Sequence, residues 1–237
     1  YNFVFKYLKK KKISGCFYPP ASVIENNQIL DVNKIHFLLE KKIDLDKLFE
    51  VSSKALDKKF GFSLNKFLLI NNSKIKKLKN RYDNHKTVVF KSLIQKLLPK
   101  NMRNFLITFL FERYVTKNVK EFSQELYLSE SNIKEMISDG MHFGSHGYKH
   151  EWWEYLDKRK QKTEINKSIK FLTKVGMKKD NLSVCYPYGS YNKSTIDIVK
   201  QPFQFGLTTI QNSINKNNIK NKFILPRYDT NIFKKIS

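Results

Sequence analysis

Cysteine is scarce in this sequence, and long hydrophobic runs are absent. The 237 residues include two cysteines, Cys16 and Cys185, which excludes a disulfide framework of the kind that holds small secreted domains together. Both cysteines lie in apolar stretches, so we expect them to be buried free thiols. The most apolar stretch, residues 105–111, is far shorter than the ~18 apolar residues that a membrane-spanning helix needs. The sequence therefore predicts no transmembrane segment.

Acidic residues and arginine are also scarce. There are 21 Asp and Glu residues against 45 Lys and Arg, which gives a formal net charge of +24, yet only five of the basic residues are arginine. Recognition of bases and phosphates relies on the planar guanidinium group of arginine, and lysine is spread over every segment here. We therefore expect no specific nucleic-acid partner, but a basic nucleic-acid-associated protein stays open as an alternative.

Apolar residues, in contrast, are present in ordinary amounts. Hydrophobic residues make up 41% of the chain and aromatic residues 14%, which is enough to build a core and excludes global disorder. The chain begins at Tyr1 and shows no signal peptide, and we interpret it as a processed, trimmed or partial chain.

The hydrophobic pattern predicts a long helical block, with alternating helices and strands before and after it. From about Asp44 to Val119 the apolar residues step by threes and fours, and the polar run Asn71 to Asn84 is the weakest part of this block. Elsewhere helices and strands alternate. Helices are expected at residues 3–12, 31–40, 129–139, 164–175 and 195–200, and strands at 13–18, 141–146, 182–186, 205–210 and 223–225. Such alternation predicts a parallel sheet or an α/β barrel, with its chemistry at the carboxyl ends of the strands.

Two histidines stand four residues apart at the end of one predicted strand. If the chain turns helically there, His146 and His150 can bind one divalent ion, as histidines at this spacing do in zinc hydrolases. The metalloprotease motif HExxH is excluded because Gly147 follows the first histidine. On spacing alone, two histidines in a polar loop remain the alternative.

Four motifs in order along the chain strengthen the metal hypothesis: Phe143-Gly-Ser-His-Gly-Tyr-Lys-His150, Cys185-Tyr-Pro-Tyr-Gly-Ser-Tyr-Asn192, Leu207-Thr-Thr209 and Leu225-Pro-Arg-Tyr-Asp229. Together they resemble the polysaccharide deacetylases, the NodB-homology or carbohydrate esterase 4 family. The start of the chain resembles the first helix and second strand of that fold. The resemblance implies one domain over residues 1–237, a distorted (β/α) barrel of the polysaccharide deacetylase type, with a helical insertion at about 44–127.

The resemblance also implies a mechanism. His146 and His150 would bind a divalent metal, zinc in the first place, with cobalt or nickel as alternatives. The main-chain N–H of Tyr188 would stabilise the oxyanion. The family's Asp-Asp motif, which supplies the catalytic base and a third metal ligand, would lie upstream of Tyr1. We therefore expect the chain by itself to bind metal weakly and to have little or no activity.

The sequence departs from the family pattern at two further points. Cys185 stands where many members carry an arginine that supports the base, and Arg227 is a candidate replacement from another strand. The usual late catalytic histidine is missing, so Asp229 is a candidate to protonate the leaving group, with a structural Arg227–Asp229 pair as the alternative. Trp152 and Trp153 are candidates to stack on a sugar ring, although core packing is the simpler expectation.

The predicted activity is that of a metal-dependent deacetylase, a hydrolase that removes an acetyl group, linked as an amide or ester, from a bacterial surface polysaccharide or its sugar precursor. The implied partner is an acetylated carbohydrate, and the implied location is bacterial, cytoplasmic or associated with the cell envelope. The alternative within the same fold is a catalytically inactive relative that binds a glycan.

Overall fold

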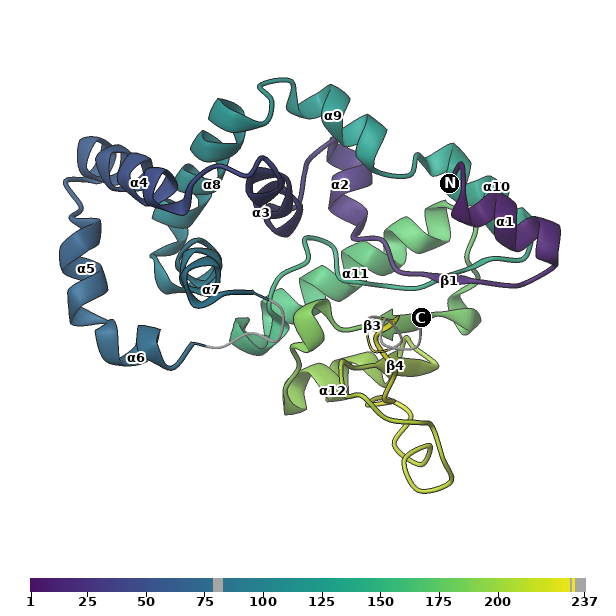
Figure 1. Ribbon diagram of the computed structural model, residues 1–237. Coiled ribbons are helices and arrows are strands. Elements are labelled where there is room, and N and C mark those ends of the chain that lie inside the picture. Colours follow the sequence, from purple (N-terminus) through teal and green to yellow (C-terminus); the bar gives the residue numbers. More distant parts are fainter. Residues whose placement is uncertain (79–82, 231, 233–237) are drawn as a thin grey trace. The chain divides into compact units, whose positions relative to one another are not determined.

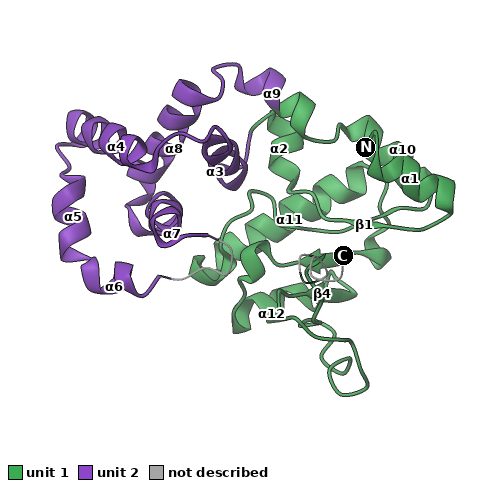
Figure 2. Cartoon of the chain, viewed as in Figure 1, with its two compact units in different colours: residues 1–28, 123–237 green, residues 29–122 purple. Residues whose placement is uncertain are grey.

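A computed structural model gives the structure of residues 1–78, 83–230 and 232 (Figure 1). The chain divides into two compact units, which Figure 2 colours green and purple. Unit 1 comprises residues 1–28 and 123–237, and unit 2 comprises residues 29–122. The insertion that we expect at about 44–127 overlaps unit 2, and its role as an insertion stays a prediction.

Unit 1 contains short parallel strands that follow one another in the order of the chain. They are β1 (Cys16–Phe17), β2 (His142–Phe143), β3 (Ser183–Cys185) and β4 (Phe205–Leu207). Strand β1 pairs with β2, and β3 pairs with β4, both in parallel. Isolated parallel bridges join Ser145 to Val184 and Leu207 to Leu225. Each segment thus lies beside its predecessor, an arrangement that requires the crossover connections of α/β folds.

The predicted barrel is found only in part. Helices and parallel strands do alternate in unit 1, but the strand pairing among the described residues does not close into a barrel. The prediction of a strand at Phe223–Leu225 is wrong, because only Leu225 forms a bridge there. The N–H of Ile224 instead donates to the carbonyl of Asn221 in a turn, so this group cannot take part in a strand ladder.

Helices of unit 1 surround its strands and share one core. They are α1 (Val4–Lys11), α2 (Ala21–Asn26), α10 (Glu130–Ser138), α11 (Lys158–Lys174) and α12 (Lys193–Val199), with short turns η2 (Trp153–Tyr155), η3 (Lys179–Asn181) and η4 (Pro187–Gly189). Helix α9 (Val119–Leu126) crosses the boundary between the units. The largest fully buried side chains of this core include Trp153, Tyr186 and Phe143. The core therefore lies directly beneath the segments that carry the sequence motifs.

Unit 2 is helical wherever it has regular structure and has a core of its own. It contains α3 (Asp31–Glu40), α4 (Leu45–Phe60), α5 (Leu64–Ile70), α6 (Asn72–Lys76), α7 (His85–Ser92), the π-helix η1 (Leu93–Leu97) and α8 (Lys100–Tyr114). Leu48, Leu56, Phe90 and Leu106 are fully buried in its core. The helical character predicted for this block is confirmed, and a short helix, α6, lies within the polar run Asn71 to Asn84, of which residues 79–82 fall outside the described part.

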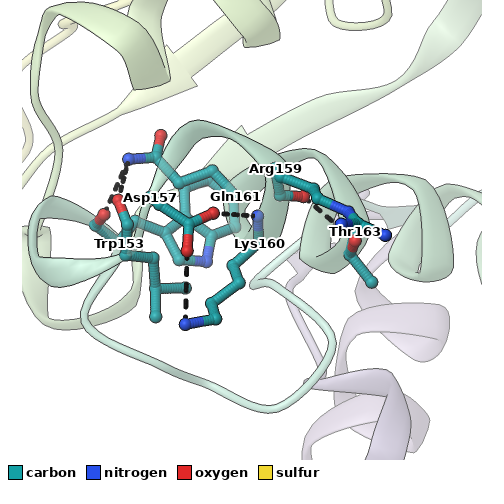
Figure 3. Close-up of polar contacts among 7 residues, drawn as sticks. Trp153, Asp157, Arg159, Lys160, Gln161 and Thr163 are labelled. Atoms are coloured by element: carbon teal, nitrogen blue, oxygen red, sulfur yellow. Dashed lines mark hydrogen bonds and ion pairs between the residues drawn. The ribbon is translucent and has the colours of Figure 1, made fainter.

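Local signals located most helices of unit 1 but misplaced one start. Helix α10 begins after Ser129 as predicted, and the Ser129 side chain accepts a hydrogen bond from the N–H of Asn132. Helix α11 begins at Lys158, six residues before the predicted start at 164. The side chain of Asp157 caps the helix by accepting from the N–H of Lys160, and Lys160 also pairs with this carboxylate (Figure 3). Helices α2 and α9 were not predicted.

The expectation of two buried thiols is half wrong. Cys185 is buried, but Cys16 is exposed. Successive side chains of a strand point to opposite faces, and the ring of Phe17 stacks on Phe143 inside unit 1, which leaves Cys16 on the outer face. Among the described residues, none of the helices has both the length and the apolar character that crossing a bilayer requires.

Candidate active site

The two motif histidines face each other directly after strand β2. The Nε2 atoms of His146 and His150 are 3.1 Å apart, and the ring centroids are 4.7 Å apart. Two nitrogens that bind one tetrahedral zinc ion at 2.0–2.1 Å stand about 3.3 Å apart. The structure thus brings the two predicted metal ligands together with their Nε2 atoms at the spacing that one ion requires.

The backbone of strand β3 orients the first of these rings. Nδ1 of His146 lies 2.6 Å from the carbonyl oxygen of Cys185. A carbonyl oxygen only accepts, so Nδ1 must carry the proton and donate it, and the lone pair of His146 is then on Nε2. A carbonyl group behind a metal-binding histidine is a frequent arrangement because it sets the tautomer and the ring orientation.

Burial keeps both rings neutral. Desolvation lowers the pKa of His146, and the positive charge of Arg227 lowers it further, although the carbonyl of Cys185 opposes this. Desolvation, together with the neighbouring His146, lowers the pKa of His150 to about 3. Neutral imidazole is the form that binds metal ions, so the pair is ready to act as ligands at neutral pH.

The loop between the histidines is held by a buried carboxylate on helix α11. Glu164 is only 7% exposed, and its Oε2 accepts hydrogen bonds from the N–H of Tyr148, at 3.1 Å, and from that of Lys149, at 2.8 Å. Burial raises the pKa of Glu164, and the two N–H donors oppose this shift. Gly147 and His150 both have positive φ, +72° and +60°. Glycine adopts this conformation freely, but a histidine is strained in it, so the loop needs such support at His150.

Tyr188, the predicted oxyanion donor, lies beside the histidine pair. It occupies the turn η4 with φ +57° and ψ +11°, and its ring contacts the ring of His150 at a centroid distance of 4.4 Å. Gly189, which follows, has φ +70°, and a Cβ there would lie 2.3 Å from Oγ1 of Thr209. Glycine thus avoids both backbone strain and a clash with Thr209 in the turn that carries Tyr188.

Arg227 and Asp229 lie on the surface after the bridge at Leu225. Nε of Arg227 donates to the carbonyl oxygen of Thr208 at 2.8 Å, and the positive charge of Arg227 lowers the pKa of the Cys185 thiol, which burial raises. Arg227 is therefore within electrostatic reach of His146 and Cys185. Asp229 is exposed, and its proposed part in the reaction stays a prediction.

A second polar cluster surrounds Ser183, two residues before Cys185 on strand β3. Nε2 of His142 lies 2.8 Å from Oγ of Ser183, and the hydroxyl of Tyr18 lies 3.0 Å from the same oxygen. Desolvation raises the pKa of Tyr18 to about 12. His142 and Tyr18 are thus both within hydrogen-bonding distance of the Ser183 hydroxyl.

Of the two adjacent tryptophans, only Trp152 remains available at the surface. Trp153 is fully buried, so its candidacy as a sugar-stacking residue is wrong. The amide of Gln161 fixes the segment by donating to the carbonyl oxygens of Trp153 and Leu156, both at 2.9 Å (Figure 3). Trp152 instead stacks face to face on Tyr188, with centroids 4.2 Å apart and an interplanar angle of 2°.

Sequence reasoning missed Glu164 and Gln161. Both lie on the buried stripe of helix α11 with Ser168 and Leu172. Acidic and amide side chains are rarely buried without partners, so their positions on the apolar face of a helix were the available signal. Such a position predicts that the side chain is buried, but it does not identify the groups to which the side chain binds.

The two histidines suit a divalent ion, but they are only part of the ligand set that such an ion needs. Imidazole nitrogens suit zinc, cobalt and nickel, and the two Nε2 atoms that face each other are the ones that a single ion would bind. No group of three His, Cys, Asp or Glu side chains suited to a metal occurs in the part of the chain that the structure describes. His146 and His150 therefore account for two of the three protein ligands that a catalytic zinc ion normally keeps.

Comparison with known proteins gives one family match. The family model "Polysaccharide deacetylase" matches residues 82–207, just over half of the chain, and the match begins within unit 2. No curated protein matches the chain.

Similar solved structures include two bacterial deacetylases. The Streptococcus pyogenes deacetylase PplD in complex with acetate is 22% identical, with 59% of this chain and 69% of that chain covered and a TM-score of 0.40. BC0361, a polysaccharide deacetylase from Bacillus cereus, is 25% identical, with 42% and 31% covered and a TM-score of 0.37. The family match carries the assignment, and it covers both histidines, Tyr188 and Glu164.

Proposed function

The chain belongs to the polysaccharide deacetylase family, and from this membership we propose that it hydrolyses an acetyl group, linked as an amide or an ester, on a bacterial surface polysaccharide or its sugar precursor. The observation that carries the proposal is the 3.1 Å approach of Nε2 of His146 to Nε2 of His150. In the metal-free chain one Nε2–H can donate to the other Nε2, and two Nε2 atoms that meet in this way lie close to the spacing that a single bound ion requires.

His146 and His150 would hold a divalent metal, zinc in the first place with cobalt or nickel as alternatives. When bound, such an ion acts as a Lewis acid on water and on the acetyl carbonyl. The carbonyl of Cys185 keeps the lone pair of His146 on Nε2, and Glu164 holds the loop that carries His150. These residues position the ligands, and burial keeps both rings neutral.

The remaining steps are proton transfer and charge stabilisation. The main-chain N–H of Tyr188 would donate to the oxyanion that forms on the acetyl carbonyl. Arg227 would stabilise negative charge beside Cys185, and Asp229 would donate the proton that the leaving amine or alcohol needs. The family resemblance assigns the general base and the third ligand to an Asp-Asp motif.

Three wider features belong to the same proposal. The parallel series of unit 1 would be part of a distorted (β/α) barrel, and unit 2 would be an insertion that selects the substrate. The protein would work in a bacterium, in the cytoplasm or at the cell envelope, with an acetylated carbohydrate as its partner.

Zinc titration and acetate release test the proposal. Isothermal titration with zinc should show that His146→Ala raises the dissociation constant by at least about tenfold, the lower end of what loss of an outer-shell partner costs. His36→Ala, a change in an exposed histidine of unit 2, is the control and should leave zinc affinity unchanged. Equal affinity in the wild type and His146→Ala would contradict the metal site.

Acetate release from an N-acetylglucosamine oligomer should be measured with the natural full-length gene product. A chelator should abolish release and added zinc should restore it. Release that persists after chelation and in His146→Ala would contradict a metal-dependent deacetylase.

A further inference from the structure

A row of aromatic rings leads away from the histidine pair. The ring of His150 contacts Tyr188, Tyr188 stacks on Trp152, and Trp152 lies 6.1 Å from Tyr155 between ring centroids. Tyr155 is 73% exposed, and Tyr188 and Trp152 are partly exposed. We call Tyr188, Trp152 and Tyr155 the aromatic ledge.

A buried side chain and several hydrogen bonds hold the backbone of the aromatic ledge in place. Trp153, between two of its members, is fully buried, and Gln161 binds the carbonyl oxygens at both ends of the turn (Figure 3). The N–H of Glu154 donates to Oγ of Ser190 at 3.0 Å, and Nδ2 of Asn192 lies 3.3 Å from the carbonyl oxygen of Glu154. These bonds tie Trp152 and Tyr155 to the segment that carries Tyr188.

Large aromatic side chains grouped at a surface, on a backbone that hydrogen bonds hold in place, need an explanation. Tyrosine and tryptophan supply wide apolar faces with little conformational entropy to lose on binding. The C–H face of a pyranose ring is apolar, and such a face packs on an aromatic ring by dispersion while its hydroxyl groups stay in water. A ledge that starts at the proposed reaction centre would hold a sugar ring next to the acetyl group that is removed.

We propose that the aromatic ledge is a binding subsite for a hexosamine ring of the substrate, with Trp152 and Tyr155 determining affinity for the polymer. This inference rests on the proposed function for the identity of the ligand. Trp152 and Tyr155 take no part in the chemistry, so their loss should weaken sugar binding and leave the metal site intact.

The probe is the tetramer of N-acetylglucosamine, titrated into the chain by calorimetry and followed by tryptophan fluorescence. We expect Tyr155→Ala and Trp152→Leu each to raise the dissociation constant about tenfold, as loss of one aromatic contact does. Tyr7→Ala, which removes a 53% exposed tyrosine of helix α1, is the matched control and should bind like the wild type. Circular dichroism and zinc titration should be unchanged in all three variants.

The outcomes separate this inference from the proposed function. His146→Ala should lose zinc affinity and still bind the tetramer. Unchanged tetramer binding in both ledge variants, or no binding to the wild type, would overturn the ledge whatever the zinc result. If Tyr155→Ala altered the sedimentation coefficient and not sugar binding, the ledge would be a contact between copies of the chain, and the inference would be wrong. Tetramer binding through the ledge without zinc-dependent acetate release would instead refute the proposed function and leave the ledge standing.

Discussion

Glu164 shows how much one buried side chain decides at this site. Its carboxylate accepts from two backbone N–H groups between His146 and His150. Without it, two amides of a loop with positive φ at both ends would lose their acceptor, and an unsatisfied buried donor costs ~1–3 kcal/mol. The spacing of the two proposed metal ligands thus depends on a residue whose carboxylate binds the loop between them.

We predict that Glu164→Ala raises the zinc dissociation constant about tenfold, as changes to residues behind metal ligands do. Glu164→Gln keeps one amide oxygen as an acceptor and should recover most of the affinity. Zinc titration of both variants checks this, with chemical denaturation run in parallel. A purely structural role would lower the free energy of unfolding in Glu164→Ala and leave zinc affinity as in the wild type.

Gly189 gives a second prediction at this scale. Alanine there must adopt φ +70° and place its Cβ 2.3 Å from Oγ1 of Thr209, so both backbone strain and a clash oppose it. Gly140→Ala is the control, because Gly140 has φ +84° and a Cβ added there would meet no atom within 4 Å. Gly189→Ala should lower the free energy of unfolding by about 1–2 kcal/mol more than the control does. Equal losses would show that Thr209 yields without cost.

At the scale of an element, helix α11 connects the two halves of the site. Its first turn carries Gln161, which fixes the aromatic ledge, and its second carries Glu164, which fixes the histidine loop. Asp157 begins the helix by capping the N–H of Lys160. This cap therefore begins the helix that carries a residue of both the proposed sugar subsite and the proposed metal site.

We predict that Asp157→Ala lowers the melting temperature by about 2–4 °C, the size of a lost helix cap in a chain of this length. Hydrogen bonds from Lys160 lower the pKa of Asp157, so the folded state favours the ionised form. The benefit is complete above the ordinary aspartate pKa of about 3.9 and is lost as the pH falls through the lowered value. Thermal denaturation between pH 7 and pH 3 checks this, and a difference that grew toward low pH would contradict it.

At the scale of the whole molecule, the two ends of unit 1 that flank unit 2 lie next to each other. Oγ of Ser123 donates to the carbonyl oxygen of Gln28 at 3.0 Å. Each unit has its own buried core. A short linker can therefore replace residues 29–122 at little entropic cost, because closing a short loop between adjacent ends is inexpensive.

We predict that a chain with residues 29–122 replaced by a Gly-Ser linker folds, unfolds cooperatively and binds zinc like the intact chain. Its substrate preference or assembly should change if unit 2 selects the substrate. Circular dichroism, zinc titration and size-exclusion chromatography check these outcomes. Loss of cooperative unfolding would show that unit 1 is not self-sufficient, and unchanged preference and assembly would leave unit 2 without the proposed role.

The sequence by itself determined most of the local elements and pointed to His146 and His150 as the proposed ligand pair. Helix α3 has the predicted bounds, and helix α10 begins at its predicted cap, because apolar periodicity and capping act over a few residues. His146 and His150 were recognisable from their spacing and from the motifs around them. These features depend on neighbours in the chain, and a sequence lists neighbours directly.

Only the tertiary structure decided which residues from distant parts of the chain contact each other. The carbonyl of Cys185 lies 39 residues from His146 in the chain, and Glu164 lies 16 residues from Tyr148. Alternation along strand β1 gave two faces but not which one is covered, so the exposure of Cys16 was predicted wrongly. The neighbouring rings of Trp152 and Tyr188 belong to separate turns. Nothing in the sequence of either turn predicts that it contacts the other. Such contacts form because a shared core brings distant segments together, and local periodicity contains no information on which segments those are.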